Sequence, residues 1–416
     1  MKHLVIRNVG PVKMVDVDLK RFNVIIGPQS SGKSTIAKIY STCSWIEKEV
    51  ATTMNEKVIA DAPAFVSLME NFHKMEGYFV GSPEILYETD VVKIALKEGI
   101  FSVVLKNQEN YQREKICYIP SERNSVTLPE LQGFEFGQTN LRSFLFDWFN
   151  AREFYKENNK AEILDLGIKY FYDPNELKYK DRIEHVNGET YRISLGSASS
   201  GLQSVVPLQV MIQYYADLYF DTFAERTSFD TETKIRKIRQ TLTDKIVLQK
   251  LFPEEFGVES RGELIKKVND LLHKDNARAL DLFFKFQSDL ERLTEPVRTS
   301  FIVEEPEQNL YPFTQIALLE YILTMCSYNN RNHSCTITTH SPFILNYLNV
   351  LIARYYKNIE DKACLNPDEL GVFVIDDGRL TDLLQVNRCT GQKNVNAEDL
   401  VEAMRYMYDE YRSLRM

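Results

Sequence analysis

The chain carries the stretch Gly27-Pro28-Gln29-Ser30-Ser31-Gly32-Lys33-Ser34-Thr35, which lies between an apolar segment and a helical pattern. The apolar segment Phe22 to Ile26 predicts a buried strand, and Ile36 to Trp45 predicts a helix. Glycines let a backbone wrap phosphates, and consecutive N–H groups at a helix N-terminus form an anion site. Lys33 would bring a charge to the β- and γ-phosphates, and the Ser34 hydroxyl would ligate Mg²⁺. The sequence therefore predicts a phosphate-binding loop.

The composition is that of an ordinary globular protein. The chain has 416 residues, of which 44% are hydrophobic and 26% charged, and this length predicts two to three domains at about 150 residues each. The net charge of −9 excludes a molecule that is basic throughout and coats nucleic acid. We find no signal-peptide core and no apolar run of the roughly 18 to 20 residues that span a bilayer. The six cysteines show no CxxC spacing, so we expect reduced thiols and a cytoplasmic protein without membrane contact.

Strand and helix patterns alternate along the chain, which favours an α/β fold with helical insertions. The apolar runs 4–6 and 15–19 predict an antiparallel strand pair at the N-terminus. Aromatic residues in 141–166 predict one long helix, and Asn187-Gly188 predicts a hairpin turn. Residues 230–297 are strongly charged and predict helices with a break at Phe252-Pro253.

Two glutamates follow a predicted strand. Phe301 to Val303 is apolar and leads directly into Glu304 and Glu305. A phosphate-binding loop needs an acidic partner at the end of another strand to hold the metal ion. Glu304 would lie nearest the Mg²⁺, and Glu305 would orient and deprotonate the attacking water. A solvated acidic turn is the alternative, which the neighbouring phosphate loop disfavours.

His340 follows the predicted strand 335–339 and precedes Ser341-Pro342. Open α/β sheets bind ligands at the carboxyl ends of their strands. The imidazole would therefore donate to a γ-phosphate oxygen or to the attacking water. On the residues alone, a histidine satisfied by local backbone groups is the favoured alternative.

Four motifs occur in one order along the chain: Gly27–Thr35, Ser199–Gln203, Glu304–Glu307 and Thr339–Pro342. This order resembles that of ABC-type ATPases of the non-transporter kind. The OLD-like and SMC-like AAA-15/AAA-21 group, with many members in bacterial anti-phage defence, looks most similar. The resemblance covers both ends of the chain well, and covers residues 50–110 and 230–297 poorly.

The resemblance implies an ABC-type P-loop ATPase head, with a mixed sheet that has antiparallel N-terminal strands, plus a helical lobe. It makes Lys33 and Ser34 part of the Walker A motif, Glu304 and Glu305 part of the Walker B motif, and His340 the switch histidine. The catalytic residues would then be Glu305 and His340, with Ser34 and Glu304 at the metal. ATP and Mg²⁺ are the cofactors that it implies.

Ser199 and Gly201 match the signature loop, which in the resembling enzymes contacts the γ-phosphate bound by a second subunit. The resemblance thus implies a homodimer or higher homo-oligomer joined through shared ATP sites. The signature differs from that of transporters, because Ser200 replaces a glycine and Leu202 replaces a glutamine. Glu304 also replaces the usual aspartate of the Walker B motif.

The motifs suggest a division of the chain into four parts. These are 1–123, the N-terminal part of the head with Walker A; 124–229, a helical lobe with the signature; 230–297, a helical insertion; and 298–416, the C-terminal part of the head with Walker B and the switch histidine. The segment Tyr118–Arg123 resembles one placed near the Q-loop, although it has no aligned glutamine.

Two hypotheses of function follow from the resemblance. In the first, the chain is an ATP-driven switch that controls a separately encoded effector in anti-phage defence. OLD-type nucleases carry a TOPRIM domain after the histidine, and only 76 residues follow His340, so a nuclease would come from another chain. In the second, the chain is a DNA-repair or recombination ATPase of the RecF or SMC kind that acts directly on DNA. A transporter subunit is disfavoured by the helical insertion and the signature.

The insertion contains a basic segment with apolar residues at helical spacing. Its bases are Lys234, Arg236, Lys237, Arg239, Lys245 and Lys250. Such a segment would contact nucleic-acid phosphates or an acidic partner. A solvated helix face is an equally good interpretation.

Overall fold

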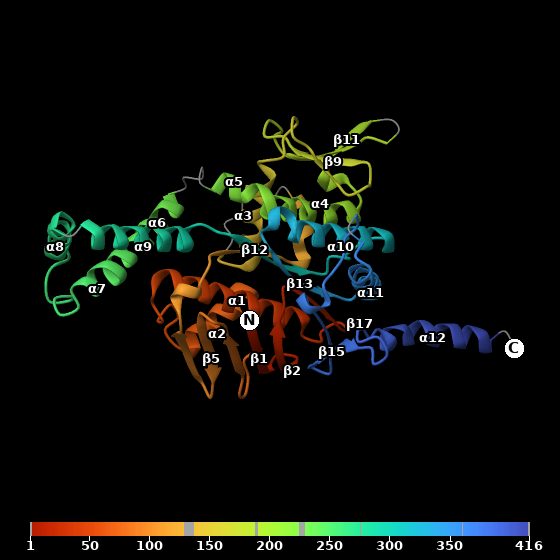
Figure 1. Cartoon of the computed structure of the whole chain (residues 1–416). Coiled ribbons are helices and arrows are strands. Elements are labelled where there is room, and N and C mark those ends of the chain that lie inside the picture. The colour runs from red at the N-terminus through yellow and green to blue at the C-terminus, as the bar shows by residue number, and fades with distance from the viewer. Residues whose placement is uncertain are drawn as a thin grey trace.

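A mixed sheet of 11 strands forms the centre of the protein (Figure 1). The computed structural model describes residues 2–128, 137–187, 190–223, 229–274, 276–359 and 361–414. The strands, in sheet order, are β6 (Ile100–Leu105), β5 (Val92–Lys97), β4 (Glu84–Glu88), β1 (Lys2–Val9), β2 (Val12–Leu19), β15 (Arg379–Asp382), β14 (Leu370–Asp376), β3 (Phe22–Ile26), β13 (Ser334–Thr339), β12 (Arg298–Glu304) and β7 (Glu114–Ile119). Helices pack on both faces, so the predicted α/β fold with a mixed sheet is confirmed.

The sheet has a parallel half and an antiparallel half. Strands β7, β12, β13, β3 and β14 all run parallel to their neighbours in that order. Strands β6, β5, β4, β1 and β2 are each antiparallel to their neighbours in that order, and the pair β1–β2 confirms the predicted N-terminal strand pair. Strand β15 joins the halves, since it is antiparallel to β14 and parallel to β2.

Alternate side chains of the parallel strands enter two different cores, as the period of a strand requires. On β3, Val24 belongs to the core on one face and Ile25 to the core on the other. The helices of the first core are α3 (Asn140–Arg152), α4 (Ser200–Gln213), α10 (Pro312–Cys326) and α11 (Pro342–Tyr356), and those of the second are α1 (Lys33–Thr53) and α2 (Ala62–His73). Strands β3 and β12 are thus covered on both faces, as is typical of parallel sheets.

The predicted single helix over 141–166 is wrong in its second half. Helix α3 ends at Arg152, and the chain then turns into a small sheet of β8 (Ala161–Glu162), β9 (Ile168–Tyr172), β10 (Asp181–His185) and β11 (Tyr191–Ser194). Asn158 and Asn159 lie in the turn, where asparagine competes with helical hydrogen bonds. The Tyr172 N–H donates to the Tyr155 carbonyl at 2.6 Å and so ties this segment to β9. The predicted hairpin is confirmed as β10 and β11, while its turn residue Gly188 lies outside the described residues.

Two helical segments project from the body (Figure 1). One is an arm of α6 (Phe229–Leu242), α7 (Gln249–Leu251), α8 (Arg261–Lys274) and α9 (Asn276–Thr294), and its predicted break at Phe252-Pro253 falls between α7 and α8. Between α4 and the arm lies α5 (Tyr219–Phe223). The other projection is α12 (Glu398–Ser413), which follows the short strands β16 (Leu384–Val386) and β17 (Lys393–Val395). Within the described ranges, no helix combines the length and apolarity needed to cross a membrane.

Candidate phosphate-binding site

Apart from Ser199 and Gly201, which lie at the start of α4, the predicted site residues lie at or just after the carboxyl ends of the parallel strands. Thr339, the last residue of β13, pairs with Ile26, the last residue of β3, and Glu304 of β12 pairs with Thr338. The loop Gly27–Gly32, the pair Glu304-Glu305 and His340 therefore leave the sheet at the same edge. This is the edge where open α/β sheets bind ligands.

The loop between β3 and α1 has the backbone that its glycines predict. Gly32 has φ +108°, a conformation that glycine adopts most readily. A Cβ on Gly27 would lie 2.4 Å from the carbonyl oxygen of Ile375, so a side chain there would collide with β14. Pro28, Gln29 and Ser30 are exposed at the tip of the loop. Phosphate oxygens would meet backbone at this position, with the N-terminus of a 21-residue helix behind it.

Lys33 lies under the loop and is 5% exposed. Its ammonium donates to the carbonyl oxygens of Gly27 at 3.0 Å and Pro28 at 2.8 Å. Burial lowers the pKa of Lys33, and the negative charges of Glu305 and Glu307 oppose that shift. These two carboxylates therefore help to keep the ammonium charged beside the loop. The neighbouring Ser31 hydroxyl is buried and has no hydrogen-bond partner among the described residues.

Glu304 is held by two donors, one on the neighbouring strand β7 and one just after it. Its carboxylate accepts from the Tyr118 hydroxyl at 2.8 Å and from the Ser121 N–H at 3.3 Å, and the residue is 3% exposed. Burial and the charge of Glu304 raise the pKa of Tyr118 well above its usual value, so the phenol keeps its proton and donates. Two lone-pair positions of the carboxylate remain for a ligand.

The residues at this edge fit a magnesium ion. Mg²⁺ prefers oxygen ligands and is commonly bound by one or two carboxylates together with substrate phosphates and waters. Ser34, in the first turn of α1, offers a hydroxyl, and Glu304 offers a carboxylate. Among the described residues, no group of three or more His, Cys, Asp or Glu side chains is arranged to hold a metal by itself. Phosphate oxygens would thus complete the coordination.

Glu305 turns out of the strand with a left-handed backbone, φ +45°. Its N–H donates to the Thr338 carbonyl at 2.8 Å, which fixes the residue beside β13. The carboxylate is 35% exposed, and its Oε1 lies 3.6 Å from Nε2 of His340. On the other side of the ring, His340 Nδ1 lies 3.5 Å from the Lys33 ammonium. His340 therefore stands between Glu305 and the phosphate loop, and not against local backbone alone.

Two residues that the sequence did not single out complete the site. The Glu307 carboxylate accepts from the His340 N–H at 2.6 Å and so fixes the turn that presents the imidazole. Arg123 is fully buried and donates to the carbonyl oxygens of Glu304 and Glu305 at 2.8 and 2.7 Å. Both lie inside motifs quoted above, but their roles depend on which strands are neighbours. No pattern within the motifs reveals that.

The predicted signature loop forms the start of α4. Ser199 caps this helix, with its hydroxyl accepting from the Leu202 N–H at 3.5 Å, and its side chain is exposed. A Cβ on Gly201 would lie 2.8 Å from the carbonyl oxygen of Asn309, in the loop that follows Glu305. The first turn of α4 thus presents N–H groups to the outside while its inner side rests on that loop.

Comparisons with known proteins give structural matches only, since neither a protein-family model nor a curated protein matches the chain. An Smc head bound to the C-terminal winged-helix domain of ScpA matches with a TM-score of 0.38 and 10% identity, over 92% of this chain and 96% of that one. An SMC head domain from Thermotoga maritima matches with a TM-score of 0.35 and 10% identity, over 91% and 97%. The recombination mediator RecF matches with a TM-score of 0.31 and 11% identity, over 92% and 97%.

Proposed function

We propose that this protein binds and hydrolyses ATP, and that two copies close around the nucleotide to form a switch. One observation carries the proposal. Lys33, Glu304, Glu305 and His340 come from three separate strand ends and meet at one edge of the sheet. A cation under a phosphate loop, a buried carboxylate and an exposed carboxylate beside a histidine are the groups that phosphoryl transfer to water requires.

Binding would use the loop and the start of α1. The backbone N–H groups of residues 30–34 would surround the phosphates, and Lys33 would exchange its bonds to loop carbonyls for bonds to phosphate oxygens. Ser34 and Glu304 would hold Mg²⁺, which supplies positive charge that neutralises the phosphates. Gln29 and Thr35 flank these contacts in the predicted binding motif, and Thr35 is 4% exposed.

Hydrolysis would use Glu305 as the general base. Its partly exposed carboxylate would orient the attacking water and accept its proton. His340 would donate a hydrogen bond to the γ-phosphate oxygen or to that water, from a ring position set by Glu307. The strained backbone at Glu305 is consistent with a functional position, because such strain concentrates at active sites.

The second half of each site would come from another copy. Ser199 and Gly201 begin a 14-residue helix whose positive end suits a γ-phosphate. A contact made only with the triphosphate would close the pair with ATP and release it after hydrolysis, which gives a switch its differential affinity.

Mixing two inactive variants tests this sharing. Lys33→Ala and Ser199→Arg chains, each inactive alone, would form a mixed pair in which one site combines two intact halves. Activity should reappear on mixing, at up to about half the wild-type rate if the sites fire independently. A Ser199→Arg protein that hydrolyses ATP at the wild-type rate by itself would contradict the shared site.

We further propose, from the motif resemblance, that the switch controls a separately encoded effector, a nuclease, in anti-phage defence. Co-purification of a neighbouring gene product that leaves when Lys33 is replaced would support this role. The alternative is a DNA-repair or recombination ATPase, and an observation on the arm favours it. Arg236, Lys237 and Arg239 are exposed on α6, whereas Ile238 and Leu242 are buried. Stimulation of ATP hydrolysis by DNA, lost when these three bases become glutamine, would favour the alternative.

A further inference from the structure

Arg123 is a buried guanidinium in which each of the five N–H groups has an acceptor. Arg123 lies in the 3₁₀ segment η2 (Ser121–Thr127), which follows β7 and Pro120. Nε donates to the Ser204 carbonyl, one terminal nitrogen to the carbonyls of Pro120 and Glu304, and the other to the Ser204 hydroxyl and the Glu305 carbonyl. The distances, in that order, are 3.1, 3.3, 2.8, 2.8 and 2.7 Å.

These acceptors belong to three segments that are distant in the sequence. Pro120 follows β7, Glu304 ends β12 and Glu305 follows it, and Ser204 lies in the second turn of α4. Arg123 and Ser204 are both 0% exposed. A planar fork with fixed N–H directions can hold three backbones in one relative position, which an ammonium or an apolar side chain cannot do.

The charge of Arg123 makes this arrangement unfavourable if its only role is to pack the three segments together. All five of its acceptors are neutral, and moving a charged group out of water is unfavourable when its hydrogen-bond partners carry no charge. Burial lowers the pKa of Arg123 to about 10, against the opposing charges of Glu307, Glu305 and Glu304, so the guanidinium stays charged at neutral pH. A function that depends on the position of Glu305 would explain why a charged arginine occupies this buried position.

A second contact joins the same two segments. Gly201, one turn before Ser204 on α4, lies so close to the Asn309 carbonyl that a Cβ would be 2.8 Å from it. The loop from Glu305 to Asn309 is thus attached to α4 at both ends, through Arg123 at one and through Gly201 at the other. A displacement of the start of α4 has to move this loop.

We infer that Arg123 is a positioning residue that links the catalytic glutamate of each chain to the signature helix of the same chain. Its fork fixes the backbone of Glu305 against Ser204 of α4. When the γ-phosphate held by a second copy contacts the α4 N-terminus, the loop that carries Glu305 shifts or stiffens with it. Occupation of one ATP site thereby sets the geometry of the base in the other. This inference rests on the proposed function and adds to it a route between the two sites.

The first test replaces the fork by a single ammonium. Arg123→Lys keeps the charge and loses the bridging of three segments. We expect turnover per folded molecule to fall by about 10- to 100-fold, while ATP affinity stays within about threefold of wild type. Because both changes act on the same group, Arg123→Lys should add almost nothing in a Glu305→Gln background. Unchanged turnover, or an equal loss in both backgrounds, would overturn the positioning role.

The second test weakens the link to α4 alone. Ser204→Ala removes the hydroxyl, one of the two acceptors that α4 offers to Arg123, and leaves the bond to the Ser204 carbonyl and the bonds to Glu304 and Glu305 in place. We expect hydrolysis by the wild type to be cooperative in ATP, with a Hill coefficient above about 1.5, and Ser204→Ala to bring the coefficient towards 1. A coefficient of 1 in the wild type, or one unaffected by Ser204→Ala, would overturn the coupling.

Arg152 provides the matched control, since it is another buried arginine, 7% exposed, that bonds Asp181 in strand β10 of the small sheet. Arg152→Lys should lower the melting temperature and leave turnover per folded molecule and the Hill coefficient unchanged. Failure of the proposed function itself is separately visible. If Glu305→Gln alone retains wild-type turnover, the base assignment is wrong, whatever Arg123→Lys does.

Discussion

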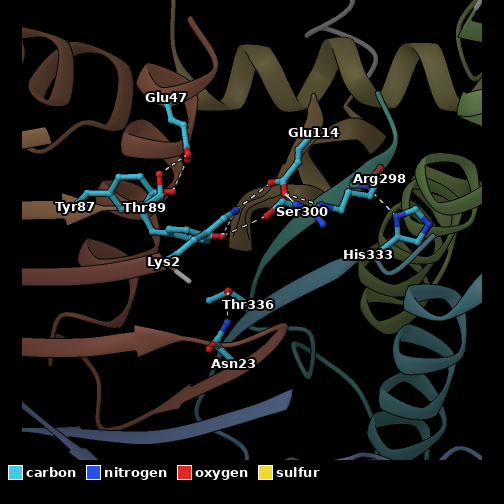
Figure 2. A network of polar contacts seen from close by, with 12 residues as sticks. Lys2, Asn23, Glu47, Tyr87, Thr89, Glu114, Arg298, Ser300, His333 and Thr336 are labelled. Carbon is cyan, nitrogen blue, oxygen red and sulfur yellow. Dashed lines mark hydrogen bonds and ion pairs between the residues drawn. The ribbon is translucent and has the colours of Figure 1, made fainter. Parts of the chain in front are cut away.

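The two ends of the same parallel strands carry polar groups that are satisfied in different ways. At the amino ends, Glu114 begins β7 and Arg298 begins β12, and the Glu114 carboxylate lies between two cations (Figure 2). It accepts from Lys2 at 3.0 Å and from Arg298 at 2.7 Å. Nearby, the Glu47 carboxylate accepts from Tyr87 and Thr89 at 2.8 and 2.7 Å. Each of these charges is bonded within the chain.

At the carboxyl ends, several polar groups still have unused hydrogen-bond donors or acceptors. The Lys33 ammonium donates to loop carbonyls, and Glu307 Oε1 accepts from the His340 N–H. Ser31 Oγ, Thr338 Oγ1 and Glu307 Oε2 are buried and lack a partner among the described residues. Buried polar atoms are rarely left so in a purely structural network. The contrast supports the proposal that the carboxyl ends bind a polar ligand, whereas the charges at the amino ends stabilise the fold.

The largest effect that separates the two ends should come from Glu305→Gln. This change keeps the shape of the side chain and removes the base, so hydrolysis should fall by roughly 10²- to 10⁴-fold while ATP binding survives. Single-turnover hydrolysis and equilibrium nucleotide binding measure the two quantities. Glu304→Gln is the control, and it should weaken Mg²⁺-dependent binding as well. Loss of binding with Glu305→Gln would exchange the roles of the two glutamates.

Lys33→Ala should affect binding more than any other single change in the loop. The motif has no second cation, so ATP affinity should fall by about 100-fold or more. Fluorescent-nucleotide titration measures this loss. An affinity within a few-fold of wild type would refute the phosphate-loop assignment.

Breaking the amino-end cluster should change stability instead. Glu114→Ala leaves Lys2 and Arg298 without their shared carboxylate, which should reduce the free energy of unfolding by about 2 kcal/mol. ATP affinity of the folded fraction should stay within about twofold. Denaturant unfolding and nucleotide titration on one preparation check both statements. A large loss of affinity with unchanged stability would reverse the contrast between the two ends.

Mild acid should produce a smaller effect on the same region. His333 accepts from the Thr299 N–H and bonds the Ala216 carbonyl, and burial lowers its pKa from 6.5 to about 4. The unfolded chain therefore binds a proton that the folded chain does not bind between these two values. The contribution of His333 to stability is complete above about pH 6.5 and is lost as the pH falls towards 4. Across this pH range, the free energy of unfolding of His333→Gln, measured with denaturant, should fall less steeply with decreasing pH than that of the wild type. An equally steep fall would contradict this contribution of His333.

The sequence could predict the position of the site because this prediction does not require the order of the strands in the sheet. Glycine spacing, an apolar run before it and a helical pattern after it define the strand, loop and helix of residues 22–45. Parallel strands place their ends at one edge, which brings Glu304 and His340 to that loop. The roles of these residues in ATP chemistry remain predictions.

The contacts that hold the site could not be predicted in the same way. Tyr118 and Glu304 are 186 positions apart and meet because β7 is the neighbour of β12. Arg123 bonds both β12 and α4 for the same reason. The turn after α3 does not follow from the sequence, because its aromatic residues continue a helical spacing, which the hydrogen bond from the Tyr172 N–H to the Tyr155 carbonyl overrides. Tertiary neighbours decided each of these cases.

Sedimentation of the Glu305→Gln protein with and without Mg·ATP tests the central claim most directly. This variant binds ATP without consuming it, so the account predicts a monomer without nucleotide and a pair of chains at saturating Mg·ATP. Adding Ser199→Arg to the same chain should abolish that association while ATP binding is retained. If Glu305→Gln sediments as a monomer at saturating Mg·ATP, or if Ser199→Arg leaves the association intact, ATP does not join two copies through the α4 N-terminus.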